Sequence, residues 1–406
     1  MLIRQREQHH HLRCTIGSRV LANTFNAFSD KVLVNDLLLD LVLDDVSPGD
    51  LYRLKRTCKR AQAVIEAYIR REFNINRHLL RFFKNPLEFR SLQARTATLI
   101  SGSNALQFLD RTTHEESDLN LYVYFEHRLE VGRWLMKNGY AFEPMRDQEP
   151  KFSAASAKCR RKKSTDGVSS SFSFVKKSQN WWKKLSIQLV VASNAPMDVI
   201  LNLHSSNLFV LHPQQSTLTA LSLAVVLNVI SWDRAYSLYP RATFEDRTDL
   251  FLRPGYYDRE EPVLDRILDK YENLGWKLCG EPRGWYRSQY DLAFTGVARW
   301  IGDSHSWVIE LDVDGVTLPP PVNEFSQPMT RDPCCLTSWW LKPGEYDEPP
   351  NVPPKLVHGI QSSKLLTYNY VTLFDPESGK QQPNCQAYKY SREGLRKDQL
   401  VQGKHL

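Results

Sequence analysis

Residues 99–125 combine residue types and spacings that suit phosphate and metal chemistry. They read LISGSNALQFLDRTTHEESDLNLYVYF, with a Gly102–Ser103 turn after an apolar run and with Asp118 and Asn120 on a strand-like segment. A glycine-serine turn that opens a helix offers backbone N–H groups and a hydroxyl to a phosphate. Side chains two residues apart on a strand share a face, so Asp118 and Asn120 can act on one ligand.

Metal-dependent nucleotide transfer needs several carboxylates that converge on two divalent ions. Here Asp118 supplies one carboxylate, and the amide oxygen of Asn120 can ligate Mg²⁺ but brings no charge. A third acid is expected on a later strand, and the strand-like segment KLSIQLVVAS at 184–193 carries Gln188 at that place. Asp198 is a weaker candidate because we expect it in the first turn of a helix, where the dipole alone favours an acid.

Two interpretations of these residues remain open on spacing alone. Asp118 and Asn120 can be ordinary solvent-facing strand positions. Alternatively, Asp118, Asn120 and Gln188 mark a degenerate metal site that still holds a nucleotide through Gly102 and Ser103. In the second case, the loss of two negative charges would severely weaken the binding of two dications.

The elements around these residues are predicted to alternate between strands and helices. The periodicity and the turn residues predict an α/β region over residues 96–251. Its predicted strands are 96–101, 117–125, 170–176 and 184–193, and its predicted helices are 104–110, 128–140, 196–204 and 240–252. Beyond it, a helix that stops at Gly275 and a strand at 304–313 are predicted.

Residues 31–82 are predicted to be helical. A short helix in VNDLLLDLVLDDV is followed by SPGDLYRLKRTCKRAQAVIEAYI, in which Ser47 can cap, Pro48 suits the first helical position and Asp50 lies three residues after the cap. Apolar residues then recur at spacings of three and four, which predicts one helical stripe. The stripe consists of Leu51, Leu54, Cys58, Ala61 and Ile65.

Residues 41–61, LVLDDVSPGDLYRLKRTCKRA, resemble the second half of the F-box pattern L-x-P-x-D-L-x-x-L-x-x-T-C-K. The first half departs from the pattern, since LVND stands where a leading Leu-Pro is usual. The resemblance implies docking to the small adaptor subunit of a cullin-type ubiquitin ligase, with Leu51, Leu54 and Cys58 as partner-binding residues. A plain helical hairpin that packs on the next domain is the alternative.

The segments ISGSNALQFLDR…SDLNLYVY and SWDRAYSLYPRATFEDR resemble the nucleotidyltransferase-fold superfamily, whose signature is Gly-Ser, a spacer and Asp-x-Asp on a strand. They also look like a fungal group that joins an F-box-like start to this fold. The resemblance implies that Gly102 and Ser103 match the phosphate turn and that Asp118 matches the first metal carboxylate. Asn120 stands where the second Asp is expected, so Mg²⁺ and a nucleoside triphosphate are implied as weak ligands.

Composition and charge place limits on the class of protein. The chain has 406 residues, 42% hydrophobic and 24% charged, which is ordinary for a globular protein. Seven scattered cysteines without a C-x-x-C motif indicate neither a zinc ribbon nor a disulfide framework. No apolar run approaches a membrane span, and the N-terminus lacks the apolar core of a secretion signal. We therefore expect an intracellular protein, cytoplasmic or nuclear, with no membrane partner.

The net charge of +7 is concentrated in one segment. Residues 151–184 hold ten Lys or Arg against one acid, which gives +9 there and leaves −2 for the rest of the chain. We expect a solvated, mobile insertion; an import signal at CRRKK and a phosphate-contacting patch are the alternatives.

The expected fold class is α+β or α/β, in five parts. These are a flexible N-terminus (1–30), F-box-like helices (31–82), a nucleotidyltransferase-like mixed sheet flanked by helices (83–251, with the basic insertion 151–184), a helix/strand extension (252–317) and a Pro-rich, largely irregular tail (318–406). The expected function is an F-box-like recognition adaptor for an unknown protein substrate, with a depleted nucleotidyltransferase-like domain. The alternative is an active Mg²⁺-dependent nucleotidyltransferase.

Overall fold

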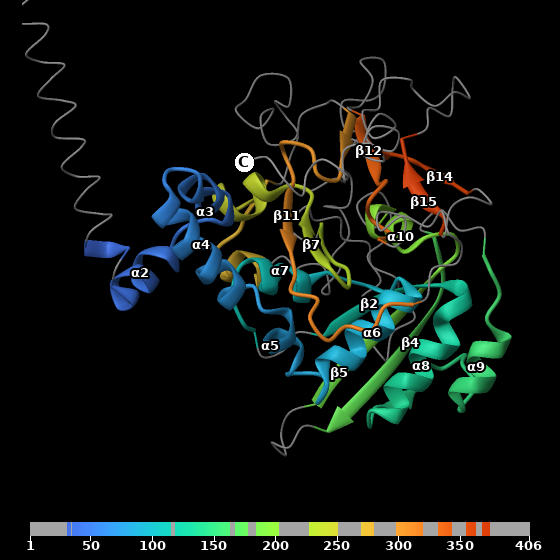
Figure 1. The fold of residues 1–406 in the computed structure, drawn as a ribbon. Helices are drawn as coiled ribbons and strands as arrows, with labels where there is room; N and C mark the ends of the chain where they lie inside the picture. The colour runs from blue at the N-terminus through green and yellow to red at the C-terminus, as the bar shows by residue number, and fades with distance from the viewer. Residues whose placement is uncertain are drawn as a thin grey trace, which may run out of the picture. The chain divides into compact units, whose positions relative to one another are not determined.

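The computed structural model divides the chain into two compact units, residues 1–72 with Leu406 and residues 73–405 (Figure 1). It describes residues 31–33, 35–114, 118–162, 167–177, 184–202, 227–250, 269–279, 298–319, 332–342, 355–362 and 368–373. The first 30 residues, for which a flexible segment was expected, lie outside these ranges.

Among its described residues, the first unit contains the helices α2 (Asp36–Leu43), α3 (Pro48–Lys55) and α4 (Lys59–Glu72). The predicted start of α3 is confirmed: the Ser47 hydroxyl accepts a hydrogen bond from the Asp50 backbone N–H at 3.1 Å and donates to the Asp50 carboxylate at 3.0 Å, with Pro48 in the first turn. The hydroxyl of Tyr68 on α4 donates to the carboxylate of Asp44 at 2.7 Å, which ties α4 to the end of α2.

The predicted single stripe is divided between two helices. The chain leaves helical geometry between Lys55 and Lys59, and the Cys58 sulfur accepts a hydrogen bond from the Ala61 N–H at the start of α4. Leu51 and Ile65 are fully buried, whereas Leu54 is half-buried. The three- and four-residue spacing of apolar residues continues across residues 56–58, so the spacing alone could not predict that the helix ends there.

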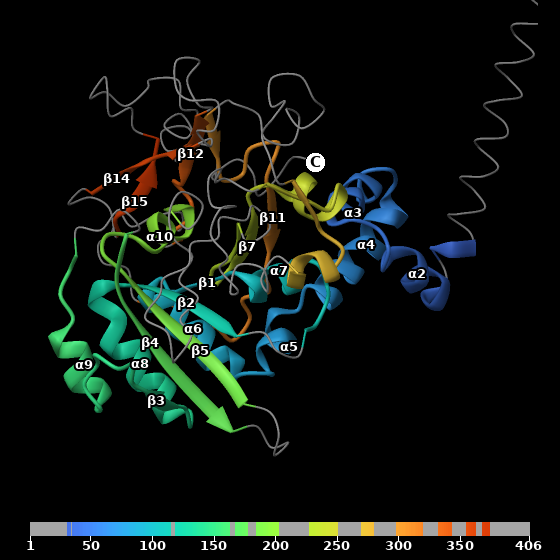
Figure 2. The ribbon, with the colours of Figure 1, turned by 180° about the vertical axis from the view of Figure 1, so that it is seen from behind.

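The second unit is built on one mixed sheet with the strand order β11-β7-β6-β1-β2-β5-β4-β3 (Figures 1 and 2). Among the described strands of this sheet, β2 and β5 are the one parallel pair. The strands are β1 (Leu99–Ser101), β2 (Leu119–Tyr124), β3 (Ala141–Glu143), β4 (Val168–Lys177), β5 (Lys184–Ala192), β6 (Asn228–Ile230), β7 (Arg234–Ser237) and β11 (Trp307–Glu310). The helices beside it are α5 (Ile75–Leu79), α6 (Pro86–Thr96), α7 (Ser103–Leu109), α8 (Arg128–Lys137), α9 (Phe152–Lys158) and α10 (Pro196–Asn202). A mixed sheet flanked by helices was predicted and is confirmed.

Helices α8 and α9 cover one face of the β5–β4 part of the sheet. Phe172 and Phe174 lie opposite Leu189 and Ile187 in the strand register and contact Phe152 of α9 edge to face. A Cβ atom on Gly132 of α8 would lie 2.1 Å from the Phe152 ring, so glycine is needed for this close approach. Figures 1 and 2 show both helices beside β4.

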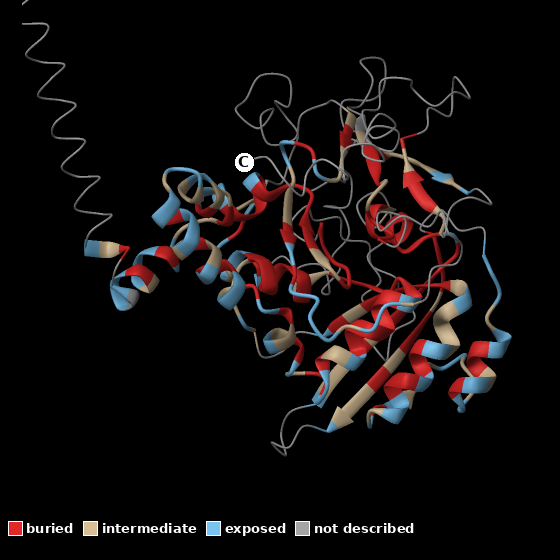
Figure 3. Ribbon diagram, in the orientation of Figure 1, coloured by how far each residue is buried: buried red, intermediate tan, exposed pale blue. Residues whose placement is uncertain are grey.

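The other face is covered at one end by α10 and by strands from the C-terminal third of the chain. Residues Pro196–Leu201 of α10 are all buried (Figure 3). The same core cluster contains Tyr122 and Val190 of the sheet together with Trp339 and Val371. The late strands in this region are β10 (Ala298–Trp300), β12 (Ser338–Lys342), β13 (Lys355–Val357), β14 (Gly359–Gln361) and β15 (Tyr370–Thr372).

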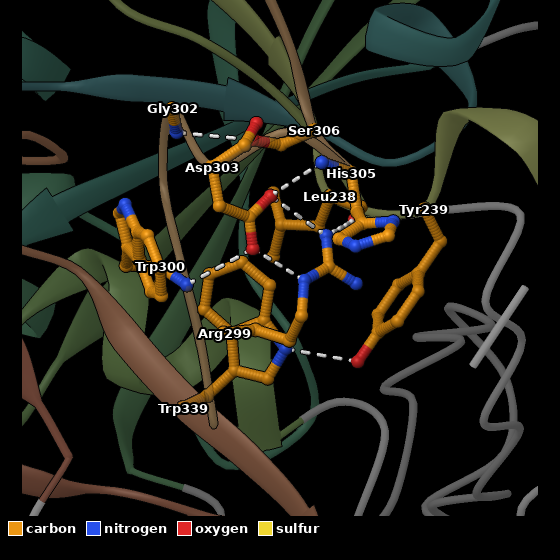
Figure 4. A network of polar contacts seen from close by, with 9 residues as sticks. All are labelled: Leu238, Tyr239, Arg299, Trp300, Gly302, Asp303, His305, Ser306 and Trp339. Atoms are coloured by element: carbon orange, nitrogen blue, oxygen red, sulfur yellow. Dashed lines mark hydrogen bonds and ion pairs between the residues drawn. The ribbon is translucent and has the colours of Figure 1, made fainter. Parts of the chain in front are cut away.

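A buried ion pair fixes β10 on this core (Figure 4). The Arg299 guanidinium donates to the Asp303 carboxylate at 2.5 and 3.1 Å and to the Leu238 carbonyl at 2.9 Å. It also lies over the rings of Tyr239 and Trp339, and the Trp339 indole N–H donates to the Tyr239 hydroxyl at 2.9 Å. Cation–π contacts and charge-assisted hydrogen bonds both compensate the burial of this cation.

Two expectations about the second unit need correction. The basic segment 151–184 is not an insertion, since its described residues form α9, β4 and the first residue of β5; residues 163–166 and 178–183 lie outside the described ranges. The tail 318–406 is not largely irregular in its described part, since it supplies β12 to β15 and fully buried residues that include Trp339 and Tyr370.

Smaller differences concern short elements. The charged helix predicted at 240–252 is one helical turn, Arg241–Glu245, followed by the strand β8 (Thr248–Leu250), which pairs with β9 (Lys277–Cys279). The hairpin β6–β7 was not predicted. The predicted strand at 304–313 is β11, and the predicted stop at Gly275 has a positive φ of 93°. Within the described ranges, every helix is too short or too polar to cross a membrane.

Candidate functional site

The Gly102 turn lies against the second strand of the predicted constellation. Gly102 has φ 77° and ψ −153°, a conformation that is essentially restricted to glycine. It joins β1 to α7, and a Cβ atom at this position would lie 2.9 Å from the side-chain nitrogen of Asn120. The structure therefore brings Gly102 and Asn120 together.

One row of polar residues crosses four neighbouring strands at this level of the sheet. Asn120 lies opposite Ser101 on one side and opposite Gln188 on the other. Gln188 in turn lies opposite Ser173, and its amide nitrogen is 3.4 Å from the Ser173 hydroxyl. We call Ser101, Asn120, Gln188 and Ser173 the polar row. The register places Gln188 directly beside Asn120, so the two residues are neighbours on one face of the sheet.

Asp118 stands next to the polar row, immediately before β2. The residue is exposed, yet partial burial of its carboxyl raises its pKa, while a hydrogen bond with Ser186 acts in the opposite direction. Ser186 precedes Gln188 by two residues, so both lie on the same face of β5. Asp118 and Gln188 therefore belong to one surface.

Three cations among the described residues act electrostatically on Asp118. The charges of Lys270, Lys184 and Arg81 all lower the pKa of its carboxyl. Lys184 also pairs with the Glu143 carboxylate at 3.0 Å, and Arg81 donates to the His114 carbonyl at 2.8 Å. These cations could not be assigned to the site from the sequence, because they come from three separate elements and only the fold brings them together.

The Gln188 amide has one enclosed atom without a partner. Its oxygen is buried and has no hydrogen-bond partner within the described residues. Rotating the amide by 180° would let the Ser173 hydroxyl donate to the oxygen, and it would place the NH₂ group where the oxygen now stands. In either orientation, one enclosed polar atom of Gln188 is left without a partner among the described residues.

Asp198 does not belong to this site. It lies in the first turn of α10, as predicted, and accepts hydrogen bonds from Asn202 at 2.9 Å and from the ring of His358 at 3.0 Å. A Cβ atom on Gly167 would lie 2.8 Å from its other oxygen, and Gly167 precedes the end of β4 that pairs with Ala192. Asp198 is therefore at the opposite end of β5 from Ser186, and it connects α10 to the C-terminal strands.

The donor set at the polar row suits an amide-lined site better than a two-metal site. Asn120 and Gln188 occupy positions next to Asp118 without adding charge, and Arg81, Lys184 and Lys270 add positive charge. Two divalent ions need several hard anionic oxygen ligands. Across the described ranges, no group of three or more His, Cys, Asp or Glu side chains is arranged to hold a metal ion.

The predicted partner-binding residues of the first unit are only partly available. Leu51 is 0% exposed, and Leu54 and Cys58 are half-buried. The exposed apolar residues lie instead on α2, where Leu37 is 79% exposed and Leu41 is 71% exposed, with Leu38 and Val42 beside them. Leu51 is thus a core residue of the unit, and we call Leu37, Leu38, Leu41 and Val42 the α2 apolar face.

Comparisons of the chain with protein-family models, with curated proteins and with solved structures gave no match.

Proposed function

We propose that this chain is a recognition protein: an F-box-like helical unit docks to the small adaptor subunit of a cullin-type ubiquitin ligase, and a nucleotidyltransferase-like unit binds a ligand without transferring a nucleotide. The observation that carries the second part is the register of Asn120 against Gln188 beside Asp118 and Gly102. At the positions where this fold would need two of its three metal carboxylates, the chain has two uncharged amides.

The test of the second unit restores the missing charges. When Mg²⁺ is titrated into the full-length wild-type protein and the heat of binding is measured by calorimetry, we expect no measurable binding. The variant Asn120→Asp with Gln188→Glu should bind Mg²⁺ measurably, because both new carboxylates face the same point as Asp118.

Two outcomes would contradict this proposal. If the double variant binds no more Mg²⁺ than the wild type, the three residues do not share a ligand. If the wild type transfers nucleotides from a triphosphate in the presence of Mg²⁺, the alternative of an active nucleotidyltransferase is correct. The matched control is Ser173→Asp with Asn120 and Gln188 left intact, which adds one charge to the row without restoring the pair.

The α2 apolar face supports the first part of the proposal. Four large apolar side chains on one short helix are exposed, next to the segment that resembles the F-box pattern. A surface of this kind is typical of an interaction site. We therefore assign the contact with the adaptor to Leu37 and Leu41 instead of Leu51.

Co-purification tests this assignment. The wild type should retain the adaptor subunit, and Leu37→Asp with Leu41→Asp should lose it without a loss of helicity. Ala63→Asp, an exposed change on α4, is the control and should retain it. The variant Leu51→Asp is not informative, since a charge at a fully buried position would unfold the unit. Absence of the adaptor from the wild-type protein would reject the assignment.

A further inference from the structure

The basic segment that follows α9 is fixed to the ends of two central strands. The Arg161 guanidinium donates to the Ser193 carbonyl, directly after β5, at 3.0 Å and pairs with the Glu126 carboxylate. The Lys162 backbone N–H donates to the hydroxyl of Ser169 on β4 at 3.5 Å. These contacts disfavour a mobile insertion, and they disfavour a linear import signal that must leave the surface to bind. A phosphate-contacting patch is the alternative that agrees with a fixed segment.

A second arginine joins this segment from the start of α8. Arg128 donates to the Ser156 carbonyl at 3.1 and 3.2 Å and to the Phe125 carbonyl at 2.5 Å. The guanidinium groups of Arg128 and Arg161 both lie over the Phe125 ring, at 3.9 and 5.1 Å from its centroid. Bonds to carbonyl groups and contacts with a ring hold the two guanidinium groups in place without neutralising their charge.

We call Arg128, Arg160, Arg161 and Lys162 the basic cluster. Among the described residues, Glu126 is the one carboxylate bonded to it, through Arg161. The side chains of Arg160 and Lys162 are exposed and have no hydrogen-bond or ion-pair partner within the described ranges. Four cations and one carboxylate leave three positive charges in excess. Residues 163–166, which lie outside the described ranges, contain one Lys and one Asp and add no net charge to the segment.

The basic cluster lies at the opposite end of β2 and β5 from the polar row. Phe125 directly follows β2 and Ser193 directly follows β5, whereas Asn120 and Gln188 lie five residues earlier on these strands. At about 3.3 Å per residue, five residues of strand span roughly 16 Å. The basic cluster is therefore a separate surface from the one that carries Asp118.

The composition of the basic cluster favours the backbone of a nucleic acid over a protein partner. Three of its four cations are arginines, and the planar fork of arginine can bond two phosphate oxygens at once. The large apolar residues that are exposed in the described ranges lie elsewhere, and none belongs to residues 125–128 or 149–162. A protein partner usually needs buried apolar anchors, whereas contacts with phosphates are sufficient for affinity to a nucleic acid.

We propose that the basic cluster binds the phosphodiester backbone of a nucleic acid, with Arg128 and Arg161 as pre-positioned contacts and Arg160 and Lys162 as exposed ones. Contacts of this kind depend little on base sequence and strongly on salt. For three or four phosphates of a single strand, a plot of log Kd against log salt concentration should have a slope of about 2–3. The inference depends neither on docking to an adaptor nor on the loss of the metal carboxylates.

Fluorescence anisotropy on the full-length protein tests the inference. The probes are labelled single strands of about 20 nucleotides, one of polyuridine RNA and one of oligothymidine DNA, in EDTA and at about 50–200 mM NaCl. We expect both probes to bind at low salt and to be released as salt rises. Equal affinities would assign the contact to the phosphates alone, and tighter binding of RNA would add a contact with the 2′-hydroxyl.

Matched variants separate the basic cluster from the net charge of the protein. Arg160→Ala with Lys162→Ala should weaken binding about tenfold at low salt and reduce the slope by about 1.4, because two contacts are lost at about 0.7 each. Arg133→Ala with Lys137→Ala removes the same charge from exposed positions of α8 and should change neither value. Lys184→Ala, at the opposite end of β5, should also leave the affinity unchanged, which separates this surface from the nucleotidyltransferase-like site.

Four results would each overturn the inference. Equal losses for the two double variants would show that only net charge matters, and a tenfold loss for Lys184→Ala would move the contact to the other end of the sheet. Failure of both probes to bind at low salt would leave the basic cluster without this ligand. Equally tight binding of polyglutamate of the same length would assign it to an acidic protein segment instead. The proposed recognition function fails independently, through nucleotide transfer by the wild type in Mg²⁺.

Discussion

Replacing Gly102 by alanine adds a single methyl group at the point where Gly102 lies against Asn120, and so tests this contact. The residue has φ 77° and ψ −153°, and residues other than glycine pay about 1–3 kcal/mol in this region. The new methyl would also lie 2.9 Å from the Asn120 side-chain nitrogen, and such overpacking costs about 1–3 kcal/mol. The reduced freedom of the unfolded chain offsets about 0.5 kcal/mol. We therefore expect Gly102→Ala to lower the free energy of unfolding by about 3 kcal/mol.

Urea unfolding followed by tryptophan fluorescence measures this change in the second unit alone. All ten tryptophans of the chain lie beyond residue 72, so the signal does not report the first unit. Gly302→Ala is the matched control, because Gly302 has φ 85° but no described atom lies within 4 Å of the place that its new methyl would take. The Gly302→Ala variant should therefore show the free-energy cost of a positive φ without the cost of a steric overlap.

A double-mutant cycle isolates the overlap itself. Asn120→Ala removes the atom that the methyl would meet, so it should recover at least about 1 kcal/mol in the Gly102→Ala background. The backbone penalty should remain. A coupling free energy below about 0.5 kcal/mol would refute the placement of Gly102 against Asn120.

Three further predictions test other parts of the structure. Trp339→Ala should lower the stability of the second unit by about 3–5 kcal/mol, because the ring is fully buried and its N–H is bonded; unchanged urea unfolding would contradict the role of β12 in the core. Burial and a nearby carboxylate raise the pKa of Asp332 to about 6 from 3.8, so the folded state binds the proton more tightly and wild-type stability should fall between pH 4 and pH 6. The variant Asp332→Asn should lack this decline. Between pH 4 and pH 6, the free energy of unfolding of the wild type should therefore fall by on the order of 3 kcal/mol more than that of the variant. Equal pH profiles for the two proteins would disprove the raised pKa of Asp332. Leu51→Ala should destabilise the first unit by about 2–5 kcal/mol, and Leu41→Ala should change it by less than about 1 kcal/mol, as followed by hydrogen exchange of its amides.

Local signals in the sequence were sufficient for several features. The Ser47–Pro48–Asp50 start of α3 depends on groups within four residues, so its pattern was readable. Alternation along 184–193 predicted correctly that Gln188 lies on a polar face. The register that brings Gln188 opposite Asn120 did not follow from either strand alone, because it depends on how β2 and β5 pair.

Features that depend on contacts between residues far apart in the chain could not be predicted from the sequence. Asp198 looked like a spare acid, but its partner His358 lies 160 residues away. The strands after residue 318 have three to five residues each, too few for a periodic pattern, and Pro-rich segments between them suggested loops. The stripe that includes Leu51 marks the interior of the first unit, and only the three-dimensional arrangement shows that Leu37 and Leu41 remain exposed.

The composition of the core cluster has a consequence for synthesis on the ribosome. The cluster joins Leu99 and Tyr122 to Val371, so a gap of about 250–270 residues separates its first members from its last. At roughly 5–20 residues per second, the apolar side of β2 and β5 waits on the order of ten seconds to a minute for its final covering strands. During that time the nascent chain exposes Val190 and its neighbours, and a chaperone that binds apolar strands has a surface to protect. Premature termination anywhere before β15 would leave that surface permanently uncovered.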